Sequence, residues 1–194
     1  MRLARPVANF GVVVLSRGRG SAVEPRIVAA GDENRLTGYA ALPLNQNPYV
    51  DEFGDPTPVA GALRPRAGVY HVVFDSTTRA NAGTYRFRFW VDDGTPPRAR
   101  IDTRIVQAGR PVTMRVSDTG AGVDPRSLEA TIDGRQVTVR LSGRVARIAD
   151  GLTPGTHRLR LQLSDFQETR NTENVTRILP NTRVVTASIT VRPA

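Results

Sequence analysis

The chain contains no cysteine, no lysine and no long apolar run. The absence of cysteine excludes disulfide bonds, zinc–thiolate sites and cysteine nucleophiles. The longest apolar run near the start, Phe10 to Leu15, is far shorter than the roughly 20 residues that a transmembrane helix needs. It also lacks the length and the cleavage pattern of a signal peptide, so we interpret it as a strand. The sequence therefore predicts no membrane span.

All 27 basic residues are arginine, and the formal net charge is +9. An inventory of arginine without lysine is typical of a GC-rich genome. The arginines are expected to stand singly at alternating strand positions, as Arg86 with Arg88 and Arg158 with Arg160 do, on the solvent face of a sheet. Binding of nucleic acid requires a focused basic patch, usually with stacking aromatic residues. We therefore expect no nucleic-acid partner.

Glycine and proline punctuate the apolar runs every 8–12 residues or so, a rhythm typical of short strands. The sequence therefore predicts an all-β protein. The clearest boundary is the Asp92–Pro97 stretch, because Pro96-Pro97 favours an extended path and cannot continue a strand ladder. We expect two tandem immunoglobulin-like β-sandwich domains, residues 1–93 and residues 99–194, joined by a Pro-Pro linker at residues 94–98.

The second half shows about seven strands, the number of an immunoglobulin-like sandwich. Asp133-Gly134 is the signal of a two-residue hairpin. Alternation places Val112, Met114 and Val116 on one inner face, and the three leucines Leu159, Leu161 and Leu163 on another. The predicted strands are Ala99–Ile105, Pro111–Ser117, Leu128–Ile132, Gln136–Leu141, Val145–Ile148, Thr156–Ser164 and Val184–Val191.

The first half is less regular, and a long loop is expected between Pro43 and Pro65, held to the sandwich by Tyr49 and Phe53. Tyr85, Phe87 and Phe89 share one sheet face, which we expect to be core, while Trp90 has the opposite parity and is expected near the linker. The predicted strands are Val7–Leu15, Ala22–Ala30, Arg35–Leu42, Gly68–Asp75 and Thr84–Val91.

A calcium site is the sharpest chemical hypothesis. Asp118 and Asp124 flank a glycine-rich loop, and Asp165 begins the next polar loop, where Glu168 follows. Calcium binds six to eight hard oxygens, which clustered loop carboxylates can supply. Against this, no regular D-x-D-x-D-G loop is present, and an aspartate before glycine also stabilises turns through its own side chain. Both interpretations of these aspartates remain open from the sequence, as they do for Asp92 and Asp93 at the linker.

No catalytic residue is predicted. The two histidines, His71 and His157, each lie at a strand start beside a turn, with no serine or acid in a triad-like arrangement. We expect both to be surface or turn-packing residues. Apart from the calcium candidates, the sequence predicts no cofactor.

Several motifs carry a resemblance to known families. Asp118-Thr-Gly-Ala-Gly-Val-Asp124, Asp133-Gly134, Pro154-Gly155-Thr156-His157 and Ser164-Asp165 resemble bacterial immunoglobulin-like or fibronectin-III-like modules of large exported proteins. The succession of Ala67–Ser76, Gly83–Asp93 and Thr95-Pro96-Pro97 is similar to the C-terminal region of large subtilisin-like serine proteases from actinobacteria. The resemblance implies an extracellular or cell-surface location.

A subtilisin-like catalytic domain needs an aspartate, a histidine and a serine on an α/β scaffold, and this chain offers neither that scaffold nor a Gly-Thr-Ser motif. We therefore expect a non-catalytic, monomeric accessory region, acting as spacer, stabiliser or docking surface, whose partner is the upstream domain of the same polypeptide. The alternative is a carbohydrate- or cell-surface-binding module, for which the Pro43–Pro65 aromatics and Tyr39 are the candidates.

Overall fold

The structure, a computed structural model, describes residues 1–31, 59–149, 151–168 and 181–194. These residues form strands almost throughout, with two short 3-10 helices, η2 (Arg79–Asn81) and η3 (Pro125–Ser127). The all-β prediction is therefore confirmed. In this part of the chain, no helix has the length and apolar character needed to cross a bilayer. The chain divides into two compact units, and the division falls between Gly94 and Thr95.

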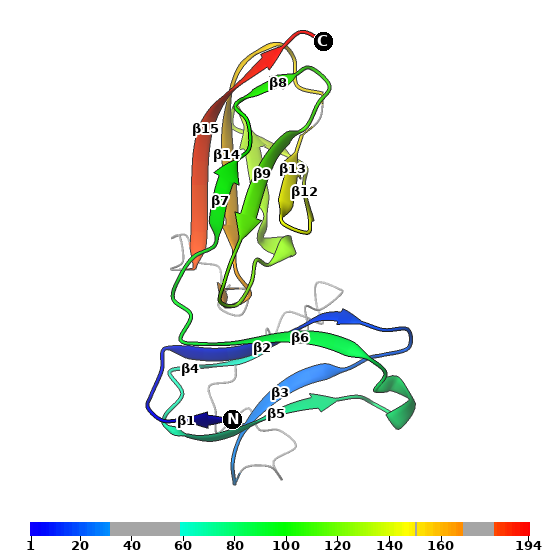
Figure 1. The fold of residues 1–194 in the computed structure, drawn as a ribbon, viewed down its shortest axis with the longest axis vertical. Coiled ribbons are helices and arrows are strands. Elements are labelled where there is room, and N and C mark those ends of the chain that lie inside the picture. The colour runs from blue at the N-terminus through cyan, green and yellow to red at the C-terminus, as the bar shows by residue number, and fades with distance from the viewer. Residues whose placement is uncertain (32–58, 150, 169–180) are drawn as a thin grey trace. The chain divides into compact units, whose positions relative to one another are not determined.

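The first unit contains two three-stranded antiparallel sheets, in the orders β1-β5-β3 and β4-β2-β6. Their strands can be followed in Figure 1. The bounds are β1 (Arg2–Leu3), β2 (Asn9–Arg17), β3 (Glu24–Ala29), β4 (Val59–Leu63), β5 (Gly68–Asp75) and β6 (Tyr85–Val91).

Residues from both sheets form the core of the first unit. Phe10 and Val12 of β2 are fully buried, as is Ile27 of β3. Tyr70 of β5 packs edge-on against Phe10, with ring centroids 6.1 Å apart, and its hydroxyl donates to the backbone carbonyl of Arg66 at 2.9 Å. Tyr70 therefore contributes apolar burial while its one polar group stays hydrogen-bonded.

Strand β4 lies within the segment from Pro43 to Pro65, for which a loop was predicted, so this part of the prediction is wrong. Its register places Ala60 opposite Val12 and Gly61 opposite Gly11. The small residues of this strand give weak alternation, so periodicity does not reveal it, and pairing with β2 decides its structure. The predicted strand Arg35–Leu42, and with it Tyr39, Tyr49 and Phe53, lie outside the described residues.

Two aromatic residues of β6, Phe87 and Phe89, differ from the prediction. Trp90 is buried, at 4% exposure, whereas Phe87 and Phe89 are 48% and 56% exposed. The register partners of Phe87 and Phe89 are Val14 and Val12 of β2, both buried, so the two phenylalanines lie on the core side of the sheet. Within the described strands β6 is at the sheet edge, and β3 of the other sheet packs against β2 and β4. The prediction that this face of β6 is core is therefore wrong for Phe87 and Phe89.

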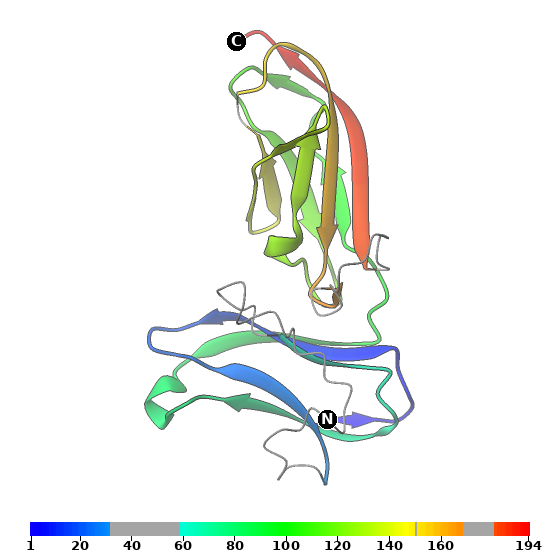
Figure 2. The same ribbon diagram turned by 180° about the vertical axis from the view of Figure 1, so that it is seen from behind.

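The second unit contains a five-stranded sheet, β11-β10-β14-β15-β8, and a four-stranded sheet, β12-β13-β9-β7. All pairs are antiparallel except β15 with β8. Figure 2 shows the long neighbours β14 and β15 from behind. The bounds are β7 (Arg98–Ile101), β8 (Ile105–Gln107), β9 (Val112–Ser117), β10 (Glu129–Ile132), β11 (Arg135–Val137), β12 (Val139–Ser142), β13 (Val145–Ile148), β14 (Gly155–Ser164) and β15 (Thr182–Arg192).

The two sheets of the second unit enclose one apolar core. The predicted inward residues are all buried: Val112, Met114 and Val116 of β9, and Leu159, Leu161 and Leu163 of β14. Burying each such side chain contributes roughly 1.5–3 kcal/mol. The Asp133-Gly134 hairpin is also confirmed, because both residues have positive φ and Ile132 pairs with Arg135.

Two predicted strands of this half are each divided between the sheets. Ala99–Ile105 separates into β7 and β8, and Gln136–Leu141 separates into β11 and β12. In the first case the alternation of inward and outward residues shifts by one position. Ile101 packs on the core, but Ile105 is 50% exposed and Val106 is buried instead. A chain that leaves one sheet for the other must break its ladder, and the alternating pattern alone does not mark that break.

Candidate functional site

The three predicted calcium ligands come from two loops at the end of strands in the second unit. Asp118 directly follows β9, Asp124 precedes η3, and Asp165 directly follows β14. The two loops are joined by backbone hydrogen bonds, from Asp124 N to Ser164 O at 3.0 Å and from Phe166 N to Gly122 O at 3.0 Å. The fold therefore places the three residues in one loop region.

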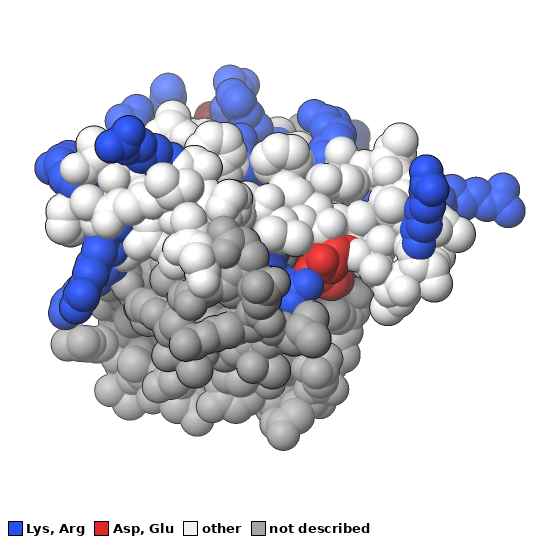
Figure 3. Space-filling view, turned by 90° about the horizontal axis from the view of Figure 1, so that it is seen from below, with Lys and Arg blue, Asp and Glu red and all other residues white. Residues whose placement is uncertain are grey.

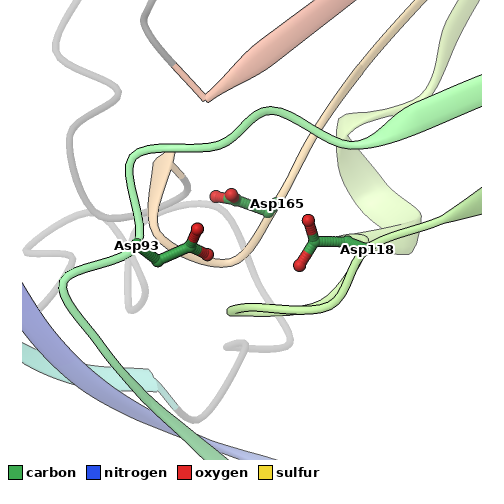
Figure 4. A group of neighbouring side chains, drawn as sticks. All are labelled: Asp93, Asp118 and Asp165. Carbon is green, nitrogen blue, oxygen red and sulfur yellow. The ribbon is translucent and has the colours of Figure 1, made fainter.

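Asp118 and Asp165 approach one another, as Figure 4 shows, with carboxylate oxygens within 4.8 Å. Asp165 is fully buried and Asp118 is half-buried. Each carboxylate also accepts hydrogen bonds within its own loop region. Asp118 Oδ2 accepts from Gly122 N at 2.7 Å, and Asp165 Oδ1 accepts from Gln167 N at 2.8 Å.

Further contacts of Asp165 tie its loop to the start of β15. Its Oδ1 also accepts from Glu168 N at 3.1 Å, and its Oδ2 accepts from the side-chain amide of Asn181 at 2.7 Å. Glu168 in turn accepts from Asn181 N at 3.0 Å. Hydrogen bonds from protein donors stabilise a buried carboxylate, which is costly to bury without them.

Asp124 acts as the N-cap of η3. Its Oδ1 accepts from Arg126 N at 2.9 Å, and Pro125 occupies the first position of the turn. The backbone carbonyl of Asp124 accepts from the Ser127 hydroxyl at 2.7 Å. Asp124 is buried, and its role in the turn matches the structural use of aspartate beside turns.

These contacts favour the turn-forming interpretation of the three aspartates. Each of these hydrogen bonds comes from a backbone N–H of the residue's own turn, which is the contact a turn-forming aspartate makes, whereas calcium requires six to eight oxygens directed at one point. The geometry brings Asp118 and Asp165 together, and it assigns Asp124 to the turn.

Asp92 and Asp93, in the first unit, bind the end of β6 to the start of β2. Asn9 and Asp93 make a reciprocal pair, with Asn9 Nδ2 donating to Asp93 O at 2.6 Å and Asp93 N donating to Asn9 Oδ1 at 2.9 Å. Asp92 Oδ1 accepts from Ala8 N at 2.8 Å. Both aspartates therefore hold the residues after β6 against the start of β2.

His157 is bound through both ring nitrogens. Nδ1 lies 2.8 Å from Oδ2 of Asp133, and Nε2 lies 2.9 Å from the backbone carbonyl of Thr153. A neutral imidazole has one donor and one acceptor nitrogen, so only the imidazolium can donate to both oxygens. Donation to Asp133, and then to Thr153, accordingly raises the pKa of His157 above 6.5.

Asp133 is the other half of this pair, and it also closes the β10–β11 hairpin. Its Oδ1 accepts from Arg158 N at 2.7 Å, and its own N–H donates to Arg158 O at 2.9 Å. The bond from Arg158 N and the bond to His157 hold the pKa of Asp133 below 3.8. The pair thus fastens the hairpin turn to the first residues of β14.

A shallow hollow of about 410 Å³ lies beside this pair on the outer side of the five-stranded sheet. Its lining is more polar than apolar, with hydroxyl, guanidinium, imidazole and carboxylate groups beside a single alanine. The lining residues are Arg104, Asp133, Thr156, His157, Arg158, Thr186, Ala187 and Ser188. His157 cannot act as a general base for Ser188, because both ring nitrogens already face other acceptors.

His71 lies exposed on β5, opposite Val28 of β3, in the strand where the sequence places it. The sequence does not reveal the link between Asp133 and His157, because the two residues are 24 positions apart and meet only through the pairing of β10 with β14. The sequence did contain one indication of this pair, an Asp-Gly turn together with a histidine at the start of a strand.

Comparison with protein-family models gives no match for this chain, and no curated protein matches it.

Proposed function

We propose that the chain is a non-catalytic accessory region of an exported subtilisin-like serine protease, made of two immunoglobulin-like β-sandwiches. It serves there as a spacer, a stabiliser or a docking surface. Its location is extracellular or at the cell surface, and its partner is the upstream domain of the same polypeptide. The motifs from Ala67 to Pro97 are the basis for the protease parent.

The sheets of the second unit support the immunoglobulin-like part of the proposal. Two mainly antiparallel sheets share one core, and the chain changes sheet between β7 and β8 and again between β11 and β12. Such a unit is stiff, because its strands are held by long ladders, of which β14 with β15 spans ten residue pairs. A stiff unit keeps a neighbouring domain at a fixed distance from a surface.

The observation that carries the non-catalytic role is the use of the reactive side chains in the described part of the chain. His157 donates to Asp133 and Thr153. Asp118, Asp124 and Asp165 accept hydrogen bonds from backbone N–H groups of their own turns. Side chains bound in this way maintain loop structure, and a catalytic group would need to face a substrate.

Activity assays on the chain alone test this role. Purified residues 1–194 should hydrolyse neither peptide nor ester substrates faster than buffer does. Hydrolysis that the His157→Gln variant abolishes would contradict the proposal. A parent protease from which residues 1–194 have been removed should keep its kcat on a short peptide and lose thermal stability or binding to its surface.

A second candidate is a carbohydrate-binding module, which the exposed aromatics of β6 favour. Phe87 and Phe89 are exposed on one side of β6, which is at the sheet edge among the described strands, and Phe87 packs on Phe74 with centroids 4.8 Å apart. Aromatic rings that are fixed and exposed can stack on sugar rings through dispersion and CH contacts. Retention of the chain on insoluble polysaccharide that is lost in Phe87→Ala/Phe89→Ala would support this candidate. Equal retention of both proteins would show that these two rings do not bind the polysaccharide.

A further inference from the structure

The four-stranded sheet of the second unit carries five arginines on its outward side. Residues such as Met114 and Ile148 point into the core, so the residues that alternate with them point to solvent. We call the outward set the arginine face. It consists of Arg98 and Arg100 on β7, Arg115 on β9, Arg140 on β12 and Arg147 on β13, all of them exposed.

The strand register sets these arginines directly against each other. Arg140 pairs with Arg147 across β12 and β13, and Arg100 pairs with Arg115 across β7 and β9. Residues directly opposite in antiparallel strands have Cβ atoms about 4.5–5.5 Å apart, and like charges at such positions destabilise a sheet. The fold thus tolerates two unfavourable pairs on one face, which indicates that the concentrated charge has a use.

Few acids balance this charge. Arg115 makes an ion pair with Asp102, at 2.9 Å, but within the described residues the other four arginines make no ion pair. The first unit differs, because Arg17 pairs with Glu24 and Arg26 pairs with Asp75. The view of Figure 3, which is from below, shows basic side chains that stand apart from one another and an acidic group close to one of them.

We propose that the arginine face binds an extended acidic polysaccharide. Guanidinium groups donate pairs of parallel N–H bonds to carboxylate or sulfate groups, and a β-sheet presents them in a fixed array. Thr113, which pairs with Arg147, and Ser142, two residues after Arg140, lie on the same face and offer hydroxyls to the sugar hydroxyl groups. Charge complementarity therefore identifies the ligand as an anionic polymer, and the hydroxyls favour a glycan.

The chemistry of the face is less suited to nucleic acid. Its outward residues include no aromatic side chain on which a base could stack. The four described strands of this sheet also present no helix that could enter a duplex groove. The inference does not rest on the proposed accessory role, because polymer binding by this face requires neither a protease parent nor the aromatics of β6.

Binding of polygalacturonate to the full chain at low salt, followed by calorimetry, tests the proposal. Arg140→Gln/Arg147→Gln should weaken binding about tenfold, since two charge-assisted contacts are lost. The matched control Arg158→Gln/Arg160→Gln removes the same charge from exposed or half-buried positions of the other sheet. It should change the affinity less than twofold. Circular dichroism should show both variants folded.

Three results would overturn the proposal. Equal loss of affinity in the control variant would mean that only net charge is recognised and that no particular face is used. Tighter binding of duplex DNA than of polygalacturonate, at the same salt concentration and with the same loss in Arg140→Gln/Arg147→Gln, would assign the face to nucleic acid. An affinity of Arg140→Gln/Arg147→Gln equal to that of the parent would show that the arginine face does not bind the polymer.

Discussion

The Nδ1 of His157 lies 2.8 Å from Oδ2 of Asp133, and this contact joins the β10–β11 turn to the start of β14. Because Nε2 faces the Thr153 carbonyl at 2.9 Å, the contact requires an imidazolium. Other charges near the ring are those of Arg104 and Arg158, which line the adjacent hollow, and Arg135, which acts on Asp133. The pair is therefore a pH-dependent connection in the second unit.

The stability of the second unit should vary with pH in two directions. The pKa of His157 is raised above 6.5, so its contribution is complete below pH 6.5 and is lost as the pH rises through the folded-state pKa. The pKa of Asp133 is lowered below 3.8, so its contribution is present above pH 3.8 and is lost as the pH falls through the folded-state pKa. Thermal unfolding followed by circular dichroism should show the highest Tm between these limits.

Substitution of the two histidines separates this effect from general titration. His157→Gln should abolish the fall of Tm above pH 6.5, whereas His71→Gln should leave it in place. If the fall persists in His157→Gln, the pair does not account for it.

Leu161→Ala should destabilise the second unit by about 2–5 kcal/mol, the usual cost of removing a large buried side chain and leaving a cavity. Leu161 is fully buried in the core of that unit. The neighbouring Arg160 points the other way along β14, so Arg160→Ala should change stability by no more than about 0.5 kcal/mol. Urea unfolding of both variants measures the difference, and similar costs would contradict the assigned faces of β14.

Gly11→Ala should destabilise the first unit by about 1–3 kcal/mol. A Cβ at Gly11 would lie 2.1 Å from Cζ2 of Trp90, which is its register partner on β6. Trp90 is the single tryptophan of the chain, so its fluorescence reports this site directly. The control Gly94→Ala places its methyl group where no atom lies within 4 Å and should unfold at the parent's urea concentration. Unchanged fluorescence and stability in Gly11→Ala would show that the indole does not pack there.

Arg140→Glu should stabilise the second unit while it weakens binding of an acidic polymer. The substitution turns a like-charged cross-strand pair with Arg147 into an opposite-charged one, which is worth about 0.2–1 kcal/mol. The gain in unfolding free energy should shrink as salt is added, because salt screens exposed charges. A loss of stability at low salt would show that the two arginines do not repel each other.

Calcium should leave the Tm of the chain unchanged. Asp118, Asp124 and Asp165 accept hydrogen bonds from backbone N–H groups, which already use part of the acceptor capacity of these carboxylates. A ligand that binds only the folded state raises Tm by mass action. A Tm that rises with millimolar calcium and falls again with chelator would therefore restore the calcium hypothesis for the close pair Asp118 and Asp165.

Alternation along single strands made much of this fold predictable. The alternation of Leu159, Leu161 and Leu163 predicts β14 and its inner face, and Asp133-Gly134 predicts the hairpin of β10 and β11. Sequence patterns of this kind are local, since inward and outward residues alternate with period two whatever the neighbouring strand is.

Features that depend on the partner strand were not predictable. Phe89 has the parity of a core residue. It is exposed because β6 lies at the edge of its sheet within the described part of the chain. Arg140 and Arg147 look like isolated solvent-facing residues in the sequence, and only the register of β12 with β13 makes them neighbours. The register of a hairpin is set by the length of its turn, and here Ser142 pairs with Val145 across two residues, whereas the predicted strands left three residues between them.

Labelling of the native polypeptide with a fluorophosphonate probe, which modifies the nucleophilic serine of serine hydrolases, tests the accessory role most directly. The account predicts that the labelled serine lies on the N-terminal side of Met1 and that no serine within residues 1–194 is modified. A labelled serine inside residues 1–194, or a native polypeptide that carries this segment and takes no label, would contradict it.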